Sequence, residues 1–257
     1  MSCWAGRARA RRKNPLPPHP AVQCDLVIPA LNEAPNIDAL FDALAPLKGD
    51  PIRRVILADN GSSDGTAAAA AARGAIVVSE PSRGYGAACL KALQWIERQA
   101  TPPDVVAFLD ADLSDDPAAL ELLLEPIRAG HAEIVIGSRV RMAEPGALSP
   151  AQRVGNRIAC LLIRMLTGRR YTDLGPFRAL RWSTLQRLQM SDRTWGWTVE
   201  MQLKAALQRI PTEEVDVPYR PRAAGRSKIS GNVRGAVAAG AKIIVTIVGL
   251  WWTHRNR

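Results

Sequence analysis

The stretch Phe108-Leu-Asp-Ala-Asp-Leu-Ser114 is the most informative part of this chain of 257 residues. An apolar run from Val105 precedes it, which is typical of a buried strand, so Asp110 and Asp112 stand where that strand ends. Two carboxylates at a buried edge need a cation, because an unpaired buried charge is costly. Mg²⁺ prefers one or two carboxylates together with substrate phosphates. The stretch therefore predicts a metal site for a nucleotide diphosphate; a solvated turn is the alternative that the motif alone leaves open.

Short apolar runs alternate with helix-like stretches from Cys24 to Gly137. The predicted strands are Leu26–Ile28, Val55–Leu57, Ile76–Val78, Val105–Leu109 and Ile134–Ile136. This alternation is typical of an α/β fold, in which a mainly parallel sheet carries helices on both faces. Such sheets bind ligands outside the carboxyl ends of their strands. The segments Pro29–Glu33, Asp59–Thr66 and Asp110–Ser114 are therefore predicted to meet at one edge.

The regular alternation decays after Gly137. The pattern there predicts a helix over Ala151–Thr167, a turn over Thr172–Arg181, a helix over Thr198–Gln208 and a strand over Val215–Val217. The apolar residues that identify the first of these helices are Val154, Ile158, Leu161, Leu162 and Met165.

Both ends of the chain differ in composition from its centre. Residues 1–20 are rich in arginine and proline without an apolar core, which predicts a disordered basic arm rather than a secretory signal. This arm is either a solvated tail or an attachment to anionic headgroups. Residues 21–231 form the predicted main domain. Residues 232–257 predict an apolar helix with a basic tail, which lies in a membrane interface with Trp251 and Trp252 at headgroup depth, packs on the domain, or spans the bilayer.

The overall charge favours an anionic partner. Lysine and arginine number 34 against 24 acidic residues, a formal charge of +10. Phosphorylated substrates, anionic lipids and nucleic acids all fit such a charge.

The four cysteines are widely spaced, with neither a zinc pattern nor a disulfide framework, which favours a reducing cytoplasm.

Two further strand exits carry polar residues suited to a nucleoside. Asn32 and Glu33 follow the first strand and can hydrogen-bond a base or ribose, although both residue types also cap helices. Asp59 ends the second strand, where its carboxylate can accept a hydrogen bond from the imino group of uracil or guanine.

Four motifs follow one another along the first half of the chain: PALNE (Pro29–Glu33), DNGSSDGT (Asp59–Thr66), SRGYGAA (Ser82–Ala88) and FLDADLSDDP (Phe108–Pro117). In this order and with these gaps they resemble the inverting family-two glycosyltransferases, which have the GT-A fold, a Rossmann-like α/β fold.

The second half narrows the resemblance. Its motifs are IGSR (Ile136–Arg139), DLGPFRALR (Asp173–Arg181), WTVEM (Trp197–Met201) and RAAGRSK (Arg222–Lys228). They resemble the dolichyl-phosphate mannose synthase group, which transfers a sugar from a nucleotide donor onto a polyprenyl phosphate.

The resemblance implies donor-binding residues and a Mg²⁺ or Mn²⁺ cofactor. The implied nucleotide-binding residues are Pro29, Leu31, Glu33, Leu57, Asp59, Asp110 and Ala111. The implied metal ligands are Asp110, Asp112 and Ser114, although Ser114 stands where these synthases commonly have glutamine. Asn60 likewise replaces the second acid of the usual acidic pair, which leaves Asp59 as the better nucleoside contact.

The resemblance also implies that basic residues of the second half face the donor and acceptor phosphates, and the following are assigned to the acceptor phosphate. The residues proposed to face it are Arg139, Arg153, Arg178, Arg222, Ser227 and Lys228. The proposed catalytic residues are Asp112, Arg139, Glu200, Arg222 and Lys228. A solvated basic loop is the alternative for the last motif. Glu200 is a general base, an orienting partner of Arg178 or a member of an ion pair, and Trp195 and Trp197 stack on a sugar or fill the core.

Elementary chemistry agrees with these assignments. A departing nucleotide diphosphate develops negative charge, which a metal and guanidinium groups stabilise. A phosphate acceptor is already ionised near neutral pH, so it needs little help from a base.

The expected activity is therefore transfer of a hexose from a UDP- or GDP-sugar to dolichyl or undecaprenyl phosphate with inversion, at the cytoplasmic side of a membrane. Two alternatives stay open: transfer to a saccharide or other non-lipid acceptor, and a basic lipid- or RNA-binding module. Charge-driven binding does not require carboxylates at sheet edges, so no nucleic-acid partner is expected. The oligomeric state is left open.

Overall fold

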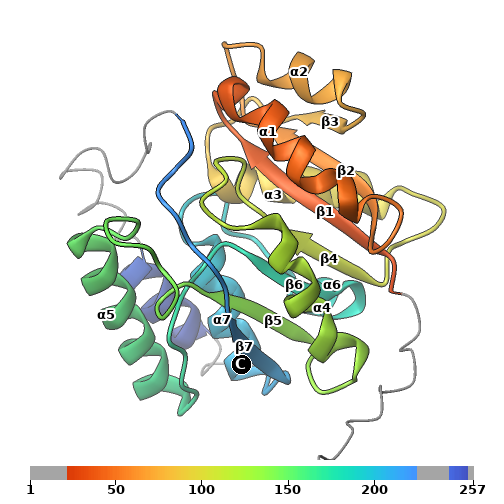
Figure 1. Cartoon of the computed structure of the whole chain (residues 1–257). Coiled ribbons are helices and arrows are strands. Elements are labelled where there is room, and N and C mark those ends of the chain that lie inside the picture. Colours follow the sequence, from red (N-terminus) through yellow and green to blue (C-terminus); the bar gives the residue numbers. More distant parts are fainter. Residues whose placement is uncertain (1–21, 225–242, 254–257) are drawn as a thin grey trace, which may run out of the picture.

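A sheet of seven strands in the order β3-β2-β1-β4-β6-β5-β7 forms the centre of the molecule (Figure 1). The computed structural model describes residues 22–224 and 243–253. The strands are β1 (Cys24–Ala30), β2 (Ile52–Asp59), β3 (Ile76–Ser79), β4 (Val105–Phe108), β5 (Ile134–Ser138), β6 (Arg178–Arg181) and β7 (Thr212–Asp216). The predicted arm over residues 1–20 and the boundary at residue 231 lie outside the described residues, so both stay predictions.

Helices connect the strands. They are α1 (Ala34–Leu44), α2 (Thr66–Ala72), α3 (Tyr85–Glu97), α4 (Leu120–Arg128), α5 (Pro150–Thr167), α6 (Trp182–Leu188) and α7 (Trp197–Leu207), with short 3₁₀ turns η1 (Ala45–Leu47) and η2 (Pro117–Ala119). A further helix, without a label in Figure 1, covers residues 243–253.

The strands that carry the predicted motifs run in parallel. β1 pairs with β2 on one side and β4 on the other, with Ala30 opposite Asp59 and Val27 opposite Phe108. Their carboxyl ends therefore lie along one edge of the sheet. The mainly parallel α/β sheet expected from the sequence is confirmed.

Alternating residues of the strands build two apolar layers. Val27, Ile56 and Phe108 belong to one cluster, together with buried residues of α3, α5, α6 and α7. Leu26 and Leu57 belong to the other, with buried residues of α1, α2 and α4. The helices thus cover both faces of the sheet, because the central strands carry apolar side chains on both faces.

The prediction of a turn over Thr172–Arg181 was wrong for its second half. Arg178–Arg181 forms β6, which lies antiparallel between β4 and β5. Ala179 and Leu180 are both buried there. A strand of four residues with an arginine at each end is too short for its alternation of apolar and polar residues to be recognised in the sequence. Its pairing partners therefore decide its structure.

The helix at residues 243–253 packs on the domain by one face. Ile247 is fully buried, and Ile243 and Leu250 contact the same apolar cluster as α5 and α7. The other face exposes Ile244, Val245, Val248 and Trp252. Within residues 22–224 and 243–253, no helix combines the length and hydropathy needed to cross a bilayer.

The amino-terminal end of α3 lies against the backbone of a second-half loop. The amide nitrogens of Gly86 and Ala87 donate to the carbonyl oxygens of Thr194 and Arg193, at 3.1 and 2.9 Å. A Cβ on Gly86 would lie only 1.9 Å from the carbonyl oxygen of Asp192. The glycine in SRGYGAA therefore permits a close approach between two halves of the chain.

We expect Gly86→Ala to destabilise the protein by about 2 kcal/mol or more, since the clash is with backbone rather than with a movable side chain. The matched control is Gly155→Ala in α5, where a Cβ would meet nothing within 4 Å. That change should stabilise by about 0.5–1 kcal/mol, because alanine is the better helix former. Urea unfolding measures both, and equal effects of the same sign would contradict this account.

Candidate active site

A cavity of about 440 Å³ opens where β1, β2 and β4 end. Several of its lining residues are those predicted from the sequence, and they are Pro29, Leu31, Glu33, Asp110, Ala111, Asp112, Arg139 and Arg222. The parallel register of the three strands brings together segments that lie far apart in the sequence. Ser227 and Lys228, also predicted, lie outside the described residues.

Asp110, which is half-buried, and Asp112, which is buried, form an acidic pair on this cavity. Burial, followed by the charge of Asp112, raises the pKa of Asp110 to about 7. The hydroxyl of Tyr85 donates to Asp110 Oδ1 at 3.1 Å, and the backbone nitrogen of Ser114 donates to Asp112 Oδ1 at 2.9 Å. Close like charges in a buried site are relieved when a cation lies between or beside them.

The residues present fit a divalent cation bound jointly with a ligand. Within residues 22–224 and 243–253, no group of three or more acidic, histidine or cysteine side chains is arranged to hold a metal ion. Two carboxylates completed by substrate phosphates are a common arrangement for Mg²⁺. Asp110 and Asp112, which both line the cavity, supply this minimal set.

A third carboxyl group, Asp115, lies close to this pair. Its side chain is buried, and neither oxygen has a hydrogen-bond partner within the described part of the chain. Burial raises its pKa well above the usual range; Arg139 opposes this effect, while Asp110 adds to it. Burial thus favours the protonated form of Asp115, and a nearby cation would favour its ionised form.

Arg222 spans the acidic end of the cavity. Its Nη2 lies 2.5 Å from Glu33 Oε1, and its Nη1 lies 3.0 Å from Asp112 Oδ2. Burial alone would lower the pKa of Arg222, but the charge of Asp112 and the hydrogen bond to Glu33 raise it. One guanidinium therefore connects the predicted nucleoside side to the predicted metal side.

The segment that carries Arg222 is held on the strand ends by its backbone. The nitrogens of Arg220 and Ala223 donate to the carbonyl oxygens of Ser114 and Asp112, at 2.9 and 3.2 Å. The position of Arg222 therefore follows from main-chain contacts with the acidic motif itself.

Asn60 organises the loop of the SRGYGAA motif. Its Nδ2 donates to the carbonyl oxygens of Glu80 and Ser82, at 2.9 and 2.8 Å, and its Oδ1 accepts from the nitrogen of Gly84 at 2.8 Å. An ionised carboxylate could donate to neither carbonyl. This geometry explains why asparagine suits a position where the resembled family commonly has an acid.

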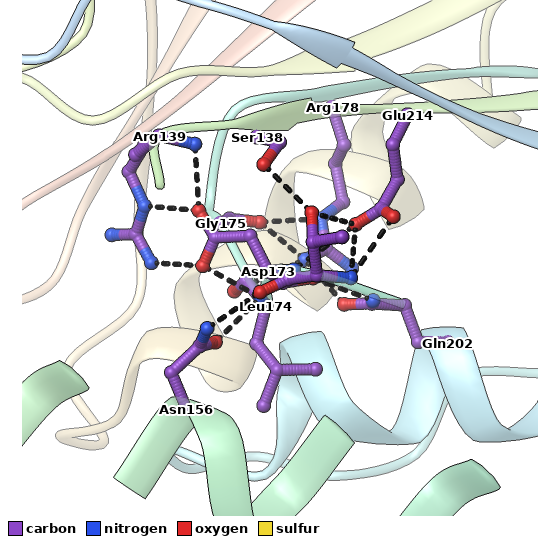
Figure 2. A network of polar contacts seen from close by, with 10 residues as sticks. Ser138, Arg139, Asn156, Asp173, Leu174, Gly175, Arg178, Gln202 and Glu214 are labelled. Atoms are coloured by element: carbon purple, nitrogen blue, oxygen red, sulfur yellow. Dashed lines mark hydrogen bonds and ion pairs between the residues drawn. The ribbon is translucent and has the colours of Figure 1, made fainter. Parts of the chain in front are cut away.

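Arg139 lines the cavity and forms an ion pair with Asp173 (Figure 2). Its Nε and Nη2 donate to the two carboxylate oxygens of Asp173, both at 2.8 Å. Burial alone would lower the pKa of Arg139 and raise that of Asp173, because it disfavours both charges. The hydrogen bonds and opposite charges of the pair outweigh burial, so the pKa of Arg139 is raised and that of Asp173 is lowered. Its guanidinium also stacks over Tyr219, 5.0 Å from the ring centre.

Three elements hold the loop that bears Asp173, as Figure 2 shows. Asn156 of α5 accepts from the nitrogen of Leu174 at 2.9 Å, and Gln202 of α7 donates to the carbonyl oxygen of Asp173 at 2.9 Å. Glu214 of β7 accepts from the nitrogen of Asp173 at 3.0 Å. The sequence alone gave no sign of this network, because its members are spread over the second half of the chain.

The structure gives Arg178 a different role from the predicted phosphate ligand. The side chain is fully buried, and it donates to the carbonyl oxygens of Gly175 and Thr198 and to Gln202 Oε1. Burial lowers its pKa to about 10. Arg178 thus supports the loop beside the cavity, and in this arrangement its guanidinium does not reach the lining.

Glu200 also lies away from the cavity, contrary to its proposed catalytic and Arg178-orienting roles. Its carboxylate accepts from the nitrogens of Ser191 and Asp192, and forms an ion pair of 2.7 Å with Lys204. The ion-pair alternative is the one observed. Glu200 fixes the start of the loop that meets Gly86.

The two tryptophans divide between the alternatives. Trp197 is buried and makes an edge-on contact with Phe108, so it fills the core. Trp195 lines the cavity, with its ring centre 6.4 Å from that of Tyr85. An exposed aromatic surface is therefore present next to the acidic pair.

Four other predicted residues do not line the cavity. Leu57 is buried in the core, and Asp59 accepts from the nitrogen of Ser62 in the turn after β2. Ser114 is buried, and its backbone nitrogen donates to Asp112 Oδ1. Arg153 is exposed on α5, with its Nε bonded to the carbonyl oxygen of Leu148. Their proposed roles in binding stay predictions.

We expect Asp173→Asn to destabilise the protein by about 3 kcal/mol or more, because it leaves the buried charge of Arg139 without its partner. The control is Asp216→Asn, whose pair with Arg141 is largely exposed and should contribute at most about 1 kcal/mol. Urea unfolding at neutral pH compares the two, and similar small costs would contradict the structural role of Asp173.

The same variant has a defined pH dependence. Folding lowers the pKa of Asp173. Its contribution to the free energy of unfolding is therefore complete above the unfolded-state pKa of about 3.9. That contribution is lost as the pH falls through the lower pKa of the folded state. The difference in unfolding free energy between the native protein and Asp173→Asn should be constant from neutral pH to about pH 5 and should shrink in stronger acid.

Comparisons with known proteins agree with this geometry. Residues 25–184 match the model of glycosyl transferase family 2. An uncharacterised glycosyltransferase of Mycobacterium tuberculosis is 35% identical over 83% of this chain and 93% of the relative. Undecaprenyl-phosphate mannosyltransferase of Micrococcus luteus is 29% identical over 81% of this chain and 88% of the relative.

Solved structures share the fold. Glucosyl-3-phosphoglycerate synthase from Mycobacterium tuberculosis, crystallised with Mn²⁺, UDP-glucose and phosphoglyceric acid, superposes with a TM-score of 0.72 and 23% identity, over 90% of this chain and 80% of that one. The sequence match spans most of the sheet and the acidic motif at the cavity. The chain therefore belongs to glycosyl transferase family 2.

Proposed function

We propose that the protein transfers a hexose from a UDP- or GDP-sugar onto a polyprenyl phosphate, with inversion at the anomeric carbon. The observation that carries the proposal is the composition of one cavity. Its lining combines the charged Asp110, Asp112 and Arg222 with the apolar Leu174, Pro176, Trp195 and Ile243. Charged and apolar side chains in one cavity suit a donor diphosphate beside a lipid-linked phosphate.

The acidic end is assigned to the donor. Asp110 and Asp112 would hold Mg²⁺ or Mn²⁺ together with the diphosphate, and a bound cation there would neutralise charge on the leaving group. Pro29, Leu31 and Glu33 then face the nucleoside. The presence of Mn²⁺ and UDP-glucose in the related synthase structure supports this assignment.

The reaction needs no general base in this scheme. An acceptor phosphate oxygen attacks the anomeric carbon as the bond to the diphosphate breaks, and the bonding electrons leave with the nucleotide diphosphate. The phosphate is already ionised near neutral pH. This agrees with the position of Glu200, which is bonded to Ser191 and Asp192 rather than placed on the cavity.

The cations assigned to the phosphates are Arg222 and Arg139, with Ser227 and Lys228 as further proposed contacts. Arg222 already contacts both Glu33 and Asp112. Arg139 is fixed by Asp173, so its orientation is set before any ligand binds. Preorganised positive charge of this kind stabilises a charge that develops during the reaction.

A lipid acceptor also agrees with the exposed apolar residues near the cavity. The helix over residues 243–253 contributes Ile243 to the lining and exposes Val245, Val248 and Trp252 on its outer face. An amphipathic helix with tryptophan is typical of the membrane interface. We therefore propose that the protein is held peripherally at the cytoplasmic face of a membrane. The relative that is an undecaprenyl-phosphate mannosyltransferase supports this acceptor class.

A small phosphorylated acceptor is the second candidate. It is favoured by the fold likeness to a synthase crystallised with phosphoglyceric acid. Both candidate acceptors carry a phosphate group. They differ in whether an apolar chain is attached to that phosphate.

The acceptor is tested with the full chain, Mg²⁺ or Mn²⁺ and a panel of radiolabelled UDP- and GDP-hexoses. Parallel reactions contain undecaprenyl phosphate in detergent or 3-phosphoglycerate. We expect label in a solvent-extractable lipid only in the first. Label in a water-soluble phosphorylated product, without any in lipid, would establish the second candidate instead.

We expect Asp112→Asn to lower the transfer rate by about 10²–10³-fold, because it removes one of the two carboxylates available to a cation. Asp38→Asn on α1 is the control, since the carboxylate of Asp38 is exposed and is not part of the lining. Initial rates over a range of Mn²⁺ concentrations, with thermal unfolding as a check of the fold, measure the effect. A folded Asp112→Asn protein with normal turnover would remove this residue from the metal site.

A further inference from the structure

The helix α5 presents an apolar stripe to solvent. Val154, Ile158, Leu161 and Met165 are between 45% and 72% exposed. They recur at intervals of four, three and four residues, so at about 100° per residue they fall within an arc of roughly 60°. Four large apolar side chains in one exposed row are a sign of an interaction surface rather than of scattered surface residues.

The core-facing side of the same helix is a separate row. Ala159, Cys160 and Ile163 are buried against the apolar cluster that also contains Val199 and Ile247. Because the core takes these residues, the exposed stripe is not needed for the packing of α5. The stripe therefore has no partner among residues 22–224 and 243–253.

Arginine is the only charged residue type along this helix and its ends. From Pro145 to Thr172 the chain has Arg153, Arg157, Arg164, Arg169 and Arg170 and no acidic residue. All five are exposed. On the helix, Arg153, Arg157 and Arg164 recur at four and seven residues and so line one flank of the stripe. The surface combines apolar side chains with arginines that form no ion pair within the described part of the chain.

The beginning of α5 also forms part of the cavity. Ser149, Gln152, Gly155 and Asn156 line it, and Ser149 and Gln152 form a capping box that fixes the start of the helix. Asn156 additionally holds the loop of Asp173 through Leu174. A surface that α5 contacts is therefore close to the proposed acceptor end of the cavity.

We propose that the stripe of α5, with its flanking arginines, is a docking surface for an anionic phospholipid bilayer. The inference rests on the proposed function, because it brings the cavity to the membrane in which a polyprenyl phosphate resides. It adds to the helix over residues 243–253 a second contact, supplied from within the catalytic domain. Apolar burial and attraction to anionic headgroups together drive such interfacial binding.

Charge decides between a bilayer and a second copy of this chain. Pairing the stripe with itself about a two-fold axis would place the arginine flanks of both copies in one interface, and like charges there are unfavourable. A surface of anionic lipid instead neutralises the arginines while it receives the apolar side chains.

The test measures binding of the full chain to sedimented vesicles of phosphatidylcholine, with or without phosphatidylglycerol. We expect binding to the anionic vesicles only, weakened by salt. Arg157→Gln with Arg164→Gln should lower the partition coefficient about 25-fold, since each cation near an anionic surface contributes about a factor of five. Leu161→Gln with Met165→Gln should lower it at least about tenfold.

The matched control is Leu122→Gln, which removes a leucine that is similarly exposed, but on α4. It should bind vesicles as the native protein does. Thermal unfolding confirms that all variants fold. Equal vesicle binding by the Leu161/Met165 variant and the native protein would overturn the proposal. So would a concentration-dependent dimer in analytical ultracentrifugation that this variant abolishes, because the stripe would then be a self-association surface.

A second assay separates this inference from the proposed function. With a short, water-soluble polyprenyl phosphate and no vesicles, the Leu161/Met165 variant should keep the native rate, whereas with undecaprenyl phosphate in anionic vesicles it should lose at least about tenfold in kcat/KM. Native vesicle binding without transfer to either lipid phosphate would contradict the proposed function alone. Equal loss on both acceptors would mean that the stripe affects the site rather than docking.

Discussion

The mutual repulsion of carboxylates at one sheet edge is the constraint on which this molecule depends. The parallel register of β1 and β4 delivers Asp110 and Asp112 to a buried edge beside Glu33, and Asp115 follows directly. Burial and the charge of Asp112 raise the pKa of Asp110 to about 7. Arg222 offsets part of this charge through its contacts with Glu33 and Asp112. A fold that gathers acids in this way gains a strong preference for cations, which a metal-assisted transfer of sugar from a diphosphate can use.

The convergence of the acidic and nucleoside motifs could be predicted because it depends on local patterns and one general rule. Apolar runs identify strands, and parallel strands bring their carboxyl ends together. Pro29, Glu33, Asp110 and Asp112 therefore line the cavity as their places in the sequence indicate. Leu57 ends in the core because the side chains of a strand alternate between its two faces, a detail that the motif alone does not reveal.

The roles of the second-half residues could not be predicted, because charge is visible in a sequence while backbone partners are not. The sequence around Arg178 indicates a phosphate ligand. In the structure Arg178 belongs to β6 and is buried, and the carbonyl oxygens of Gly175 and Thr198 accept its hydrogen bonds. Glu200 likewise meets backbone nitrogens of a loop eight and nine residues before it. Asp173 is the converse case, since a residue with no assigned role fixes Arg139.

Different faces of the helix α5 contact the core, the cavity and the solvent. The apolar residues that identify it in the sequence are mostly those on its exposed side, whereas the smaller Ala159 and Cys160 face the core with Ile163. Its beginning meanwhile lines the cavity and holds the Asp173 loop through Asn156. An apolar stripe in a sequence is therefore not sufficient to say which side of a helix is buried. Here the helix joins the network around Arg139 to an exposed basic and apolar surface, so a bilayer bound to that surface would lie beside the residues proposed to receive its lipid phosphate.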